Sequence, residues 1–290
     1  MKEDQQPPPF GAHAFIWTGE WDAAGGRRAI QGAAGAGLDF IEIPLLRLDG
    51  LDVRGTRDLL DEFAIGCSCS LGLPEALHLP AAADRAETWL NRAVDATVGL
   101  RGTILTGALY THLGTLTGKP PTEEELQTVG RVLKAVAKRA QEHGVSLGIE
   151  AINRYETYII NLSSQALEML ERVDEDNVFV HLDTYHMNVE EKGFFEPIVA
   201  AGEKLGYVHL SESDRGTPGT GNVHWDDVFR ALGEIHFRGP LVMESFVAVN
   251  EDIKGATAIW RDVVGDPELL IQDGLTFLRK RAIQHGLVDA

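Results

Sequence analysis

Four side chains of the kind that bind divalent metals end four strand-like runs in the second half of the sequence. They are Glu150, Asp183, His209 and Glu244, and successive members are roughly 30 residues apart, about the length of one strand-helix-strand unit. If the strands are neighbours in a parallel barrel, all four side chains converge at one end of it. Three carboxylates and one imidazole form an oxygen-rich site without thiolate, which suits Mn2+, Co2+ or Mg2+.

The convergence of three carboxylates is itself an argument for a cation. Buried like charges raise each other's pKa and destabilise the fold unless a positive charge compensates them. Any one of these acidic residues, taken alone, would more simply be solvated or paired with a nearby lysine. Taken together, they predict one divalent metal ion held by all four side chains, provided that the barrel forms.

Three further polar side chains follow these runs within six residues. They are Glu156, His186 and Arg215. Each alone also fits a structural role: an ion pair between Glu156 and Arg154, a satisfied imidazole, and a solvated charge on a loop. Together, an acceptor, an imidazole and a guanidinium around a metal are what a small polyhydroxylated substrate needs for its orientation.

The rest of the chain alternates strand-like and helical patterns, which explains how these residues could meet. Eight such repeats without a break in composition predict an α/β fold with one domain, a (β/α)8 TIM barrel over residues 10–290. Residues 1–9, which end in three prolines, are expected to form a flexible tail. The expected strands lie near 10–17, 38–45, 66–73, 101–109, 146–152, 178–186, 206–212 and 239–246. The expected helices lie near 23–36, 54–64, 83–97, 123–143, 163–173, 195–203, 225–234 and 256–284.

One boundary is marked by local chemistry. Thr122 followed by Glu125 predicts a capping box, and three consecutive glutamates in the first turn oppose the helix dipole. Gly144 then ends this helix. The next strand begins at once, so Glu150 is expected near its C-terminal end, where barrel enzymes build their sites.

Composition excludes several partners. The chain of 290 residues has 26 basic and 44 acidic residues, a formal charge of -18 that repels nucleic acid. No apolar run approaches the roughly 18 residues of a membrane span, and the acidic start does not resemble a signal peptide. We therefore expect a cytoplasmic protein with no nucleic acid and no membrane partner. Cys67 and Cys69 are expected to be reduced thiols, because a bridge between them would be strained; a lining role in the site is the alternative.

Five sequence blocks together resemble the ketose 3-epimerases, the D-tagatose, D-psicose (allulose) and L-ribulose 3-epimerases among the xylose-isomerase-like barrels. The resemblance spans nearly the whole chain, and the second and third blocks are the most specific. The blocks are residues 11–17, 148–157, 181–188, 208–213 and 242–246.

The resemblance implies residue roles as well as an activity. It implies a Mn2+, Co2+ or Mg2+ ion on the four ligands named above, with Glu156, His186 and Arg215 gripping the oxygens of a free ketose. Trp17 fits the aromatic-rich first strand that shapes the sugar pocket in this family, although ordinary barrel packing explains it equally well. His112 stands near a position where several members carry tryptophan, so the sequence leaves the substrate preference open. The family also implies a homodimer or a homotetramer.

The implied reaction exchanges ketoses that differ at C3, such as D-fructose and D-psicose, D-tagatose and D-sorbose, or L-ribulose and L-xylulose. One base on one face cannot remove a hydrogen and return it to the other face without moving. Glu150 and Glu244 are therefore expected to face each other across the metal, one removing the C3 proton and the other returning it through a cis-enediolate.

Other activities of the same barrel type stay open at this point. An aldose-ketose or hydroxypyruvate isomerase, or an inosose dehydratase, would also use a metal and paired acids. A DNA-repair nuclease on this barrel fits less well, because it needs more histidine ligands and a basic docking face. A non-catalytic sugar-binding or scaffold protein would not need paired acidic residues at the site.

Overall fold

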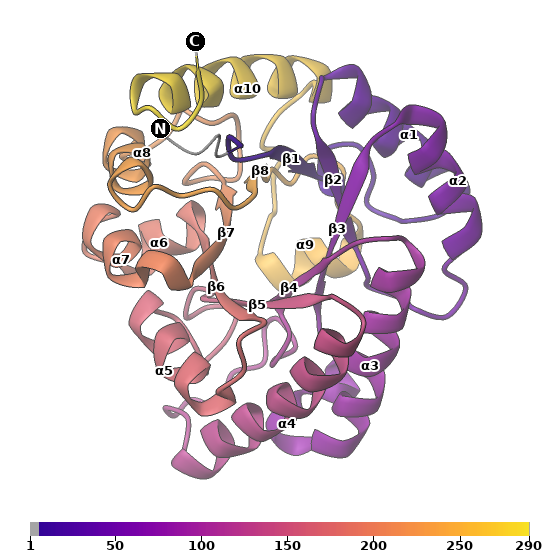
Figure 1. Cartoon of the computed structure of the whole chain (residues 1–290), viewed down its shortest axis with the longest axis vertical. Helices are drawn as coiled ribbons and strands as arrows, with labels where there is room; N and C mark the ends of the chain where they lie inside the picture. The colour runs from indigo at the N-terminus through magenta and orange to yellow at the C-terminus, as the bar shows by residue number, and fades with distance from the viewer. Residues whose placement is uncertain (1–5, 290) are drawn as a thin grey trace.

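The chain forms a closed barrel of eight parallel strands surrounded by helices, as the computed structural model of residues 6–289 shows (Figure 1). The strands follow one another around the barrel in sequence order, and the first strand also pairs with the last. The predicted (β/α)8 TIM barrel is therefore confirmed. The strands are β1 (Phe10–His13), β2 (Phe40–Pro44), β3 (Gly66–Gly72), β4 (Ile104–Ala108), β5 (Ser146–Glu150), β6 (Val178–Asp183), β7 (Leu205–Leu210) and β8 (Leu241–Met243).

Ten α-helices and four short 3-10 helices connect the strands within the described residues. The predicted capping box of α4 is confirmed, since Thr122 and Glu125 exchange side-chain and backbone hydrogen bonds. The helices are α1 (Ala23–Gly35), α2 (Val53–Phe63), α3 (Ala83–Gly99), α4 (Glu123–Glu142), α5 (Ser163–Val173), α6 (Thr184–Glu190), α7 (Phe195–Ala201), α8 (Trp225–Glu234), α9 (Glu251–Thr257) and α10 (Pro267–Gln284). The 3-10 helices are η1 (Ala14–Ile16), η2 (Glu75–Leu77), η3 (Leu79–Ala81) and η4 (Gly202–Lys204).

All eight strands end before the residues that the sequence predicted, and at the ends of β1 and β6 a polar side chain caps a helical turn. After β1, the His13 ring accepts a hydrogen bond from Phe15 N and η1 begins. After β6, the Asp183 carboxylate accepts from Tyr185 N and α6 begins, where the sequence analysis expected strand to residue 186. Such short polar side chains compete with strand pairing for backbone donors.

The prediction of a single helix over residues 256–284 is wrong. The structure has two helices here, α9 and α10, separated by residues 258–266. Proline lacks the N–H that a helix interior needs but fits the first helical position. Pro267 occupies that position in α10, and Asp266 caps the helix by accepting from Glu268 N at 2.9 Å.

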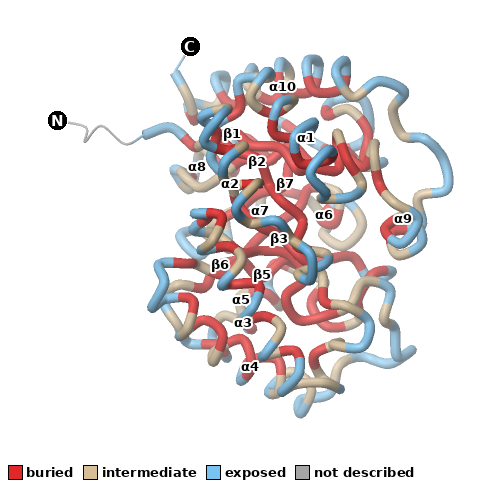
Figure 2. The backbone as a smooth tube through the Cα atoms, turned by 90° about the vertical axis from the view of Figure 1, so that its right-hand side faces the viewer, coloured by how far each residue is buried: buried red, intermediate tan, exposed pale blue. Residues whose placement is uncertain are grey.

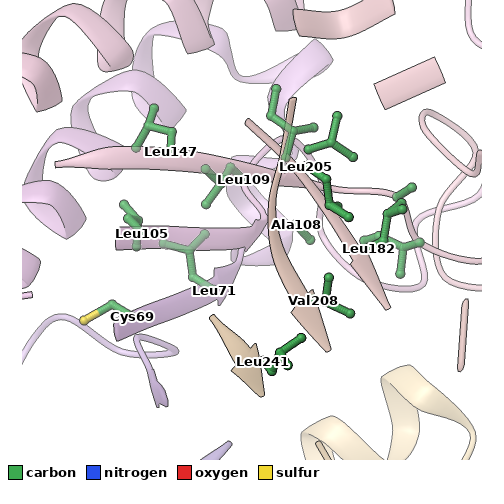
Figure 3. Close-up of a cluster of buried hydrophobic side chains, with 14 of the residues drawn as sticks. Cys69, Leu71, Leu105, Ala108, Leu109, Leu147, Leu182, Leu205, Val208 and Leu241 are labelled. Atoms are coloured by element: carbon green, nitrogen blue, oxygen red, sulfur yellow. The ribbon is translucent and has the colours of Figure 1, made fainter. Parts of the chain in front are cut away.

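The outer faces of the strands form the main hydrophobic core with the surrounding helices. Leu182 lies between His181 and Asp183 in sequence, and alternation along the strand therefore places it on the opposite face. Figure 3 shows Leu182 together with Leu147 and other apolar side chains of the strands. The strands form a buried centre, and exposed positions concentrate on the outer turns of the helices (Figure 2).

The inner faces of the strands are packed around aromatic rings at the N-terminal end of the barrel. Phe179 lies against two glycines, and a methyl group added to Gly148 or Gly206 would approach its ring to within 2.6 Å or 2.4 Å. Gly148 also leaves room for the Thr106 hydroxyl. These glycines are required for close approach in a filled barrel interior, and Gly148 directly precedes the end of β5 that carries Glu150.

The first residues of the described chain already belong to the barrel. Residues 1–5 of the expected tail lie outside the described residues. Pro8 is buried, and the carbonyl of Pro9 accepts a hydrogen bond from Leu241 N at 2.9 Å. The chain therefore joins the barrel before Phe10.

Two expectations from composition can be compared with the fold. Cys67 and Cys69 are both free, as predicted, and the Cys67 thiol lies 3.5 Å from the carbonyl oxygen of Leu100. Across residues 6–289, no helix combines the length and the apolar character that crossing a membrane requires.

The close packing at Gly148 predicts that an added methyl group destabilises the fold. We expect Gly148→Ala to lower the free energy of unfolding by about 1–3 kcal/mol, because its methyl group overlaps Thr106 and Phe179. Gly35→Ala is the matched control: it ends α1, has no atom within 4 Å of the added carbon, and should be neutral or stabilising by about 0.5–1 kcal/mol. Urea unfolding followed by circular dichroism measures both; equal effects would contradict the packing argument.

Candidate active site

The four candidate metal ligands meet at the C-terminal end of the barrel. Glu150 and Asp183 are the last residues of β5 and β6, His209 is the penultimate residue of β7, and Glu244 directly follows β8. The register pairs Asp183 with His209. All four side chains are buried. The structure thus brings together the residues that the sequence placed on four separate strands.

The ring of His209 lies among the three carboxylates. Its Nδ1 is 3.5 Å from Glu244 Oε2, 3.7 Å from Glu150 Oε1 and 4.0 Å from Asp183 Oδ2. Buried groups of this composition, with ligand atoms all within 4.8 Å of one another, are consistent with a divalent metal site. Three such groups occur among the described residues: Asp183–His209–Glu244, Glu150–Asp183–His186 and Glu150–His181–His209.

The residues present fit a metal ion. His209 Nδ1 is buried, and no described residue offers it a hydrogen bond. Burial by itself lowers the pKa of His209, but the charges of Glu42 and Glu244 outweigh burial and raise it well above its ordinary value. The cluster therefore favours a positive charge at Nδ1. A divalent cation bound here would supply that charge and could take the nitrogen as a ligand.

Arg215 reaches further into the cluster than the sequence indicated. Its Nη1 lies 2.5 Å from Asp183 Oδ2 and also contacts Glu244 Oε2. The guanidinium is stacked between two rings, 4.0 Å from the centre of Tyr185 and 4.4 Å from that of Phe246. A buried arginine held this way keeps one position, because ion pairs fix its edge and aromatic rings fix its faces.

Glu156 and His186 are linked by Asn153, which the sequence analysis did not single out. Asn153 donates from Nδ2 to Glu156 Oε1 at 2.7 Å and from its backbone N–H to His186 Nδ1 at 3.1 Å. Arg154 is paired instead with Glu190, at 2.7 Å, so the predicted alternative of an ion pair with Glu156 does not occur. Burial raises the pKa of Glu156 to about 7. His186 lies in α6, not at the end of the strand expected over residues 178–186.

One cavity joins these groups to an apolar wall. Ile253 and Thr257 of α9 line it, and in Figure 1 this helix is projected over the space enclosed by the strands. Leu113 lines the cavity, whereas His112 is not among its described lining residues. The polar lining includes Glu150, Glu156, His186, His209, Arg215 and Glu244, and the apolar lining includes Phe15, Leu46, Leu113, Phe246 and Ile253.

The structure does not bring Trp17 to this cavity. Trp17 lines a groove between α1 and α10, and a methyl group at Gly32 of α1 would lie 2.4 Å from its Nε1. The early end of β1 and the turn of η1 carry Trp17 past the mouth of the barrel. Of the two roles weighed for this residue, the structure favours packing.

Glu42 is a buried carboxylate that the sequence analysis missed. It lies in β2 with no exposed surface, and its Oε2 accepts from Tyr207 Oη at 2.6 Å and from His209 Nε2 at 2.8 Å. Burial raises the pKa of a carboxyl, but the contacts with His209 outweigh it and lower the pKa of Glu42 to about 2. The signal in the sequence is one acidic residue inside an otherwise apolar strand, residues 40–44.

Comparison with known proteins agrees with this architecture. The family model described as xylose isomerase-like TIM barrel matches residues 30–281. An L-ribulose 3-epimerase of Methylomonas sp. (strain DH-1) is 40% identical over 278 residues, 94% of this chain and 97% of that protein. A ketose 3-epimerase of Arthrobacter globiformis is 39% identical over 278 residues, 94% of this chain and 96% of that protein.

A solved structure extends the likeness to three dimensions. The crystal structure of D-allulose 3-epimerase from Methylomonas sp. in complex with D-allulose has a TM-score of 0.92 and 39% identity, with 95% of this chain and 98% of that chain covered. Fold and sequence together define a class of sugar-converting TIM barrels. The chain belongs to the ketose 3-epimerase family and is an isomerase.

The raised pKa of Glu156 makes the stability effect of Glu156→Gln depend on pH. The native state binds the proton more tightly than the unfolded chain, whose ordinary value is 4.5. The stability from this group is thus fully present below 4.5 and is lost as the pH rises through about 7. We therefore compare the unfolding free energy of Glu156→Gln with that of wild type. When the pH is raised from 5 to 8, this difference should shift in favour of the variant by about 2 kcal/mol.

Urea unfolding in the presence of a chelator measures this difference. The control is Glu203→Gln, which replaces an exposed carboxylate on η4. Its difference in unfolding free energy from wild type should be the same at both pH values. A gain that is equal at both pH values would show that Glu156 does not titrate in this range.

Proposed function

We propose that this chain interconverts free ketoses that are epimeric at C3, with Glu150 and Glu244 as the proton-transferring pair. The observation that carries the proposal is the placement of these two carboxylates at the ends of β5 and β8, with Asp183 and His209 on the strands between them and one cavity lined by Glu150, His209 and Glu244. We propose that a substrate carbon held in that cavity would lie between the two carboxylates. Removal of a proton from one face and its return to the other needs such an arrangement.

Glu150, Asp183, His209 and Glu244 are the residues that we propose to hold the metal. When bound, a divalent cation polarises the ketone and stabilises the negative charge that develops on the enediolate oxygens. Three carboxylates with a single imidazole support Mn2+, Co2+ or Mg2+. The orphaned Nδ1 of His209 supports its place in the set.

The surroundings of Glu150 and Glu244 shift their pKa values in opposite directions, as a proton donor and a proton acceptor require. Burial raises the pKa of Glu150. Burial acts in the same direction on Glu244, but the charges of Arg215 and His209 outweigh it and hold its pKa well below the ordinary range. The pKa values of the two carboxyls are thus shifted in opposite directions, and pairs separated like this are typical of a proton donor and acceptor.

Three side chains are proposed to orient the sugar. Arg215 has its guanidinium at the cavity and offers N–H donors to substrate oxygens, while its stacking keeps it in place. Asn153 fixes His186 and Glu156 as neighbours, so an imidazole and a carboxyl face the same space. Each of these groups can bond a hydroxyl or a carbonyl oxygen.

The substrate class follows from the relatives and from the lining of the cavity. The relatives named above act on L-ribulose or on ketoses, and one structure holds D-allulose. We propose ketopentoses and ketohexoses as substrates, including L-ribulose and D-psicose (allulose). The cavity-lining residues described here include no lysine, which a proton-shuttling isomerase would often use. Assembly as a dimer or tetramer and a cytoplasmic location stay predictions.

Turnover in D2O tests the reaction. With Mn2+ or Co2+ added, we expect L-ribulose and D-psicose to yield their C3 epimers with deuterium at C3, located by NMR after the metal is removed. C3 must gain the label because its proton leaves and returns in each cycle. Deuterium at C1 or C2 with aldose as product would instead establish an aldose-ketose isomerase and overturn the proposal.

Substitution of either glutamate tests the proton-transferring pair. We expect Glu150→Gln and Glu244→Gln to lower kcat by at least about 10³-fold, because each loses a carboxylate that both holds the metal and moves the proton. Circular dichroism should show a folded barrel. Glu234→Gln, at the exposed end of α8, is the control and should keep wild-type activity. A variant with near wild-type epimerisation would remove that glutamate from the pair.

A further inference from the structure

A polar layer lies below the proposed metal ligands, inside the barrel. Ser68, Tyr207 and Glu42 form a chain of short hydrogen bonds that ends on His209, with oxygen-oxygen distances of 2.7 Å and 2.6 Å and a final 2.8 Å contact. All four side chains are buried. Nothing in the proposed chemistry of the ketose uses Glu42, and its contact with His209 therefore needs its own explanation.

We propose that Glu42 is a positioning residue of the metal site: it holds the proton of His209 on Nε2 and thereby keeps Nδ1 free to bind the metal ion. The inference rests on the proposed function, because it takes His209 as a ligand. It extends that proposal by naming the group that makes this imidazole a ligand through one particular nitrogen.

The hydrogen bonds around Glu42 set the direction of each proton. An ionised carboxylate only accepts, so both groups on Glu42 Oε2 must donate: the hydroxyl of Tyr207 and the Nε2–H of His209. A neutral imidazole carries one proton. With that proton on Nε2, the lone pair lies on Nδ1, which faces Glu150, Asp183 and Glu244.

The ring of His209 cannot exchange its two nitrogens without losing these contacts. It packs edge to face against His181, with ring centres 4.2 Å apart, and against Tyr207, at 5.7 Å. A flipped ring would turn a carbon toward Glu42 and another toward the carboxylate cluster. Packing therefore fixes the plane of the ring, and Glu42 decides which nitrogen carries the proton.

His13 completes the surroundings of Glu42. Phe15 N–H donates to His13 Nδ1 at 3.1 Å, so the neutral His13 ring carries its proton on Nε2. That nitrogen lies 3.5 Å from Glu42 Oε1. The same nitrogen makes a hydrogen bond with Ser70 Oγ at 3.4 Å, and Glu42 Oε1 has no hydrogen-bond partner among the described residues. The contacts of Oε2 alone therefore set the direction of the protons.

Stability alone gives no reason for this arrangement. A buried ionised carboxylate is expensive to desolvate, and its partners seldom do more than offset that cost. Histidines that bind metals typically donate their other N–H to a carboxylate, and loss of that partner weakens metal binding by about 10- to 100-fold. The position of Glu42 matches this second role.

Metal affinity of Glu42→Gln tests the inference. A glutamine is neutral and can turn its N–H2 toward His209, which then carries its proton on Nδ1 and loses its ligand nitrogen. We expect the affinity for Mn2+, measured by titration calorimetry, to fall by about 10- to 100-fold. The visible absorption of bound Co2+ should change as well, because its ligand set changes. Glu42→Asp keeps the charge and should recover part of the affinity.

Tyr207→Phe is the matched control, since it removes one hydrogen bond from Glu42 and leaves the contact with His209. Its Mn2+ affinity should stay within about threefold of wild type. An equal loss in both variants, or a folded Glu42→Gln protein with wild-type affinity, would overturn the inference. If the wild-type chain fails to bind one Mn2+, the proposed metal site itself is contradicted, and this inference is contradicted with it.

A measurement on the unaltered protein covers the case in which Glu42→Gln does not fold. NMR of the Mg2+-loaded protein labelled with 15N-histidine reports which ring nitrogen carries a proton. We expect the ring of His209, identified by the signals that are lost in His209→Asn, to carry a hydrogen-bonded proton on Nε2 and none on Nδ1. A proton on Nδ1 of His209 would contradict the inference.

Discussion

The need to balance three buried carboxylates with positive charge governs the functional end of this barrel. Glu150, Asp183 and Glu244 surround one imidazole nitrogen at 3.5 to 4.0 Å, in a region from which water is largely excluded. Their mutual repulsion would destabilise the fold if nothing opposed it. The position of Arg215 and the proposed metal both answer this same constraint.

The site is built in layers along the barrel axis, and each layer limits the next. Phe179 and the glycines around it close the N-terminal end of the barrel. Glu42 and Tyr207 form a polar layer above them, and the carboxylate cluster lies above that. An eight-stranded barrel has little space inside, so a side chain in one layer is held by the layer below it. This rigidity is what a site needs to keep reacting groups in place.

Arg215 lies on the loop after β7, and hydrogen bonds and ion pairs hold this loop in one conformation. The loop after β7 is anchored by Glu212, whose carboxylate accepts from Gly219 N at 2.8 Å and from Trp225 Nε1 at 3.0 Å. Arg215 itself has a positive φ of 65°, a strained backbone that persists where surrounding contacts determine it. Such strain, together with the ion pairs to Asp183 and Glu244, is typical of a functional position.

The sequence by itself determined the barrel and the convergence of four ligand-type residues, because alternation of strands and helices fixes which strand ends share one end of a parallel barrel. It also predicted the capping box of α4, which is a local feature. Only the tertiary structure decided the places of Trp17, Arg215 and Glu42. Trp17 lies outside the cavity, Arg215 pairs with two of the carboxylates, and Glu42 meets His209 across 167 positions of the chain. Contacts between distant residues depend on how whole layers pack, and no local pattern in the sequence carries that information.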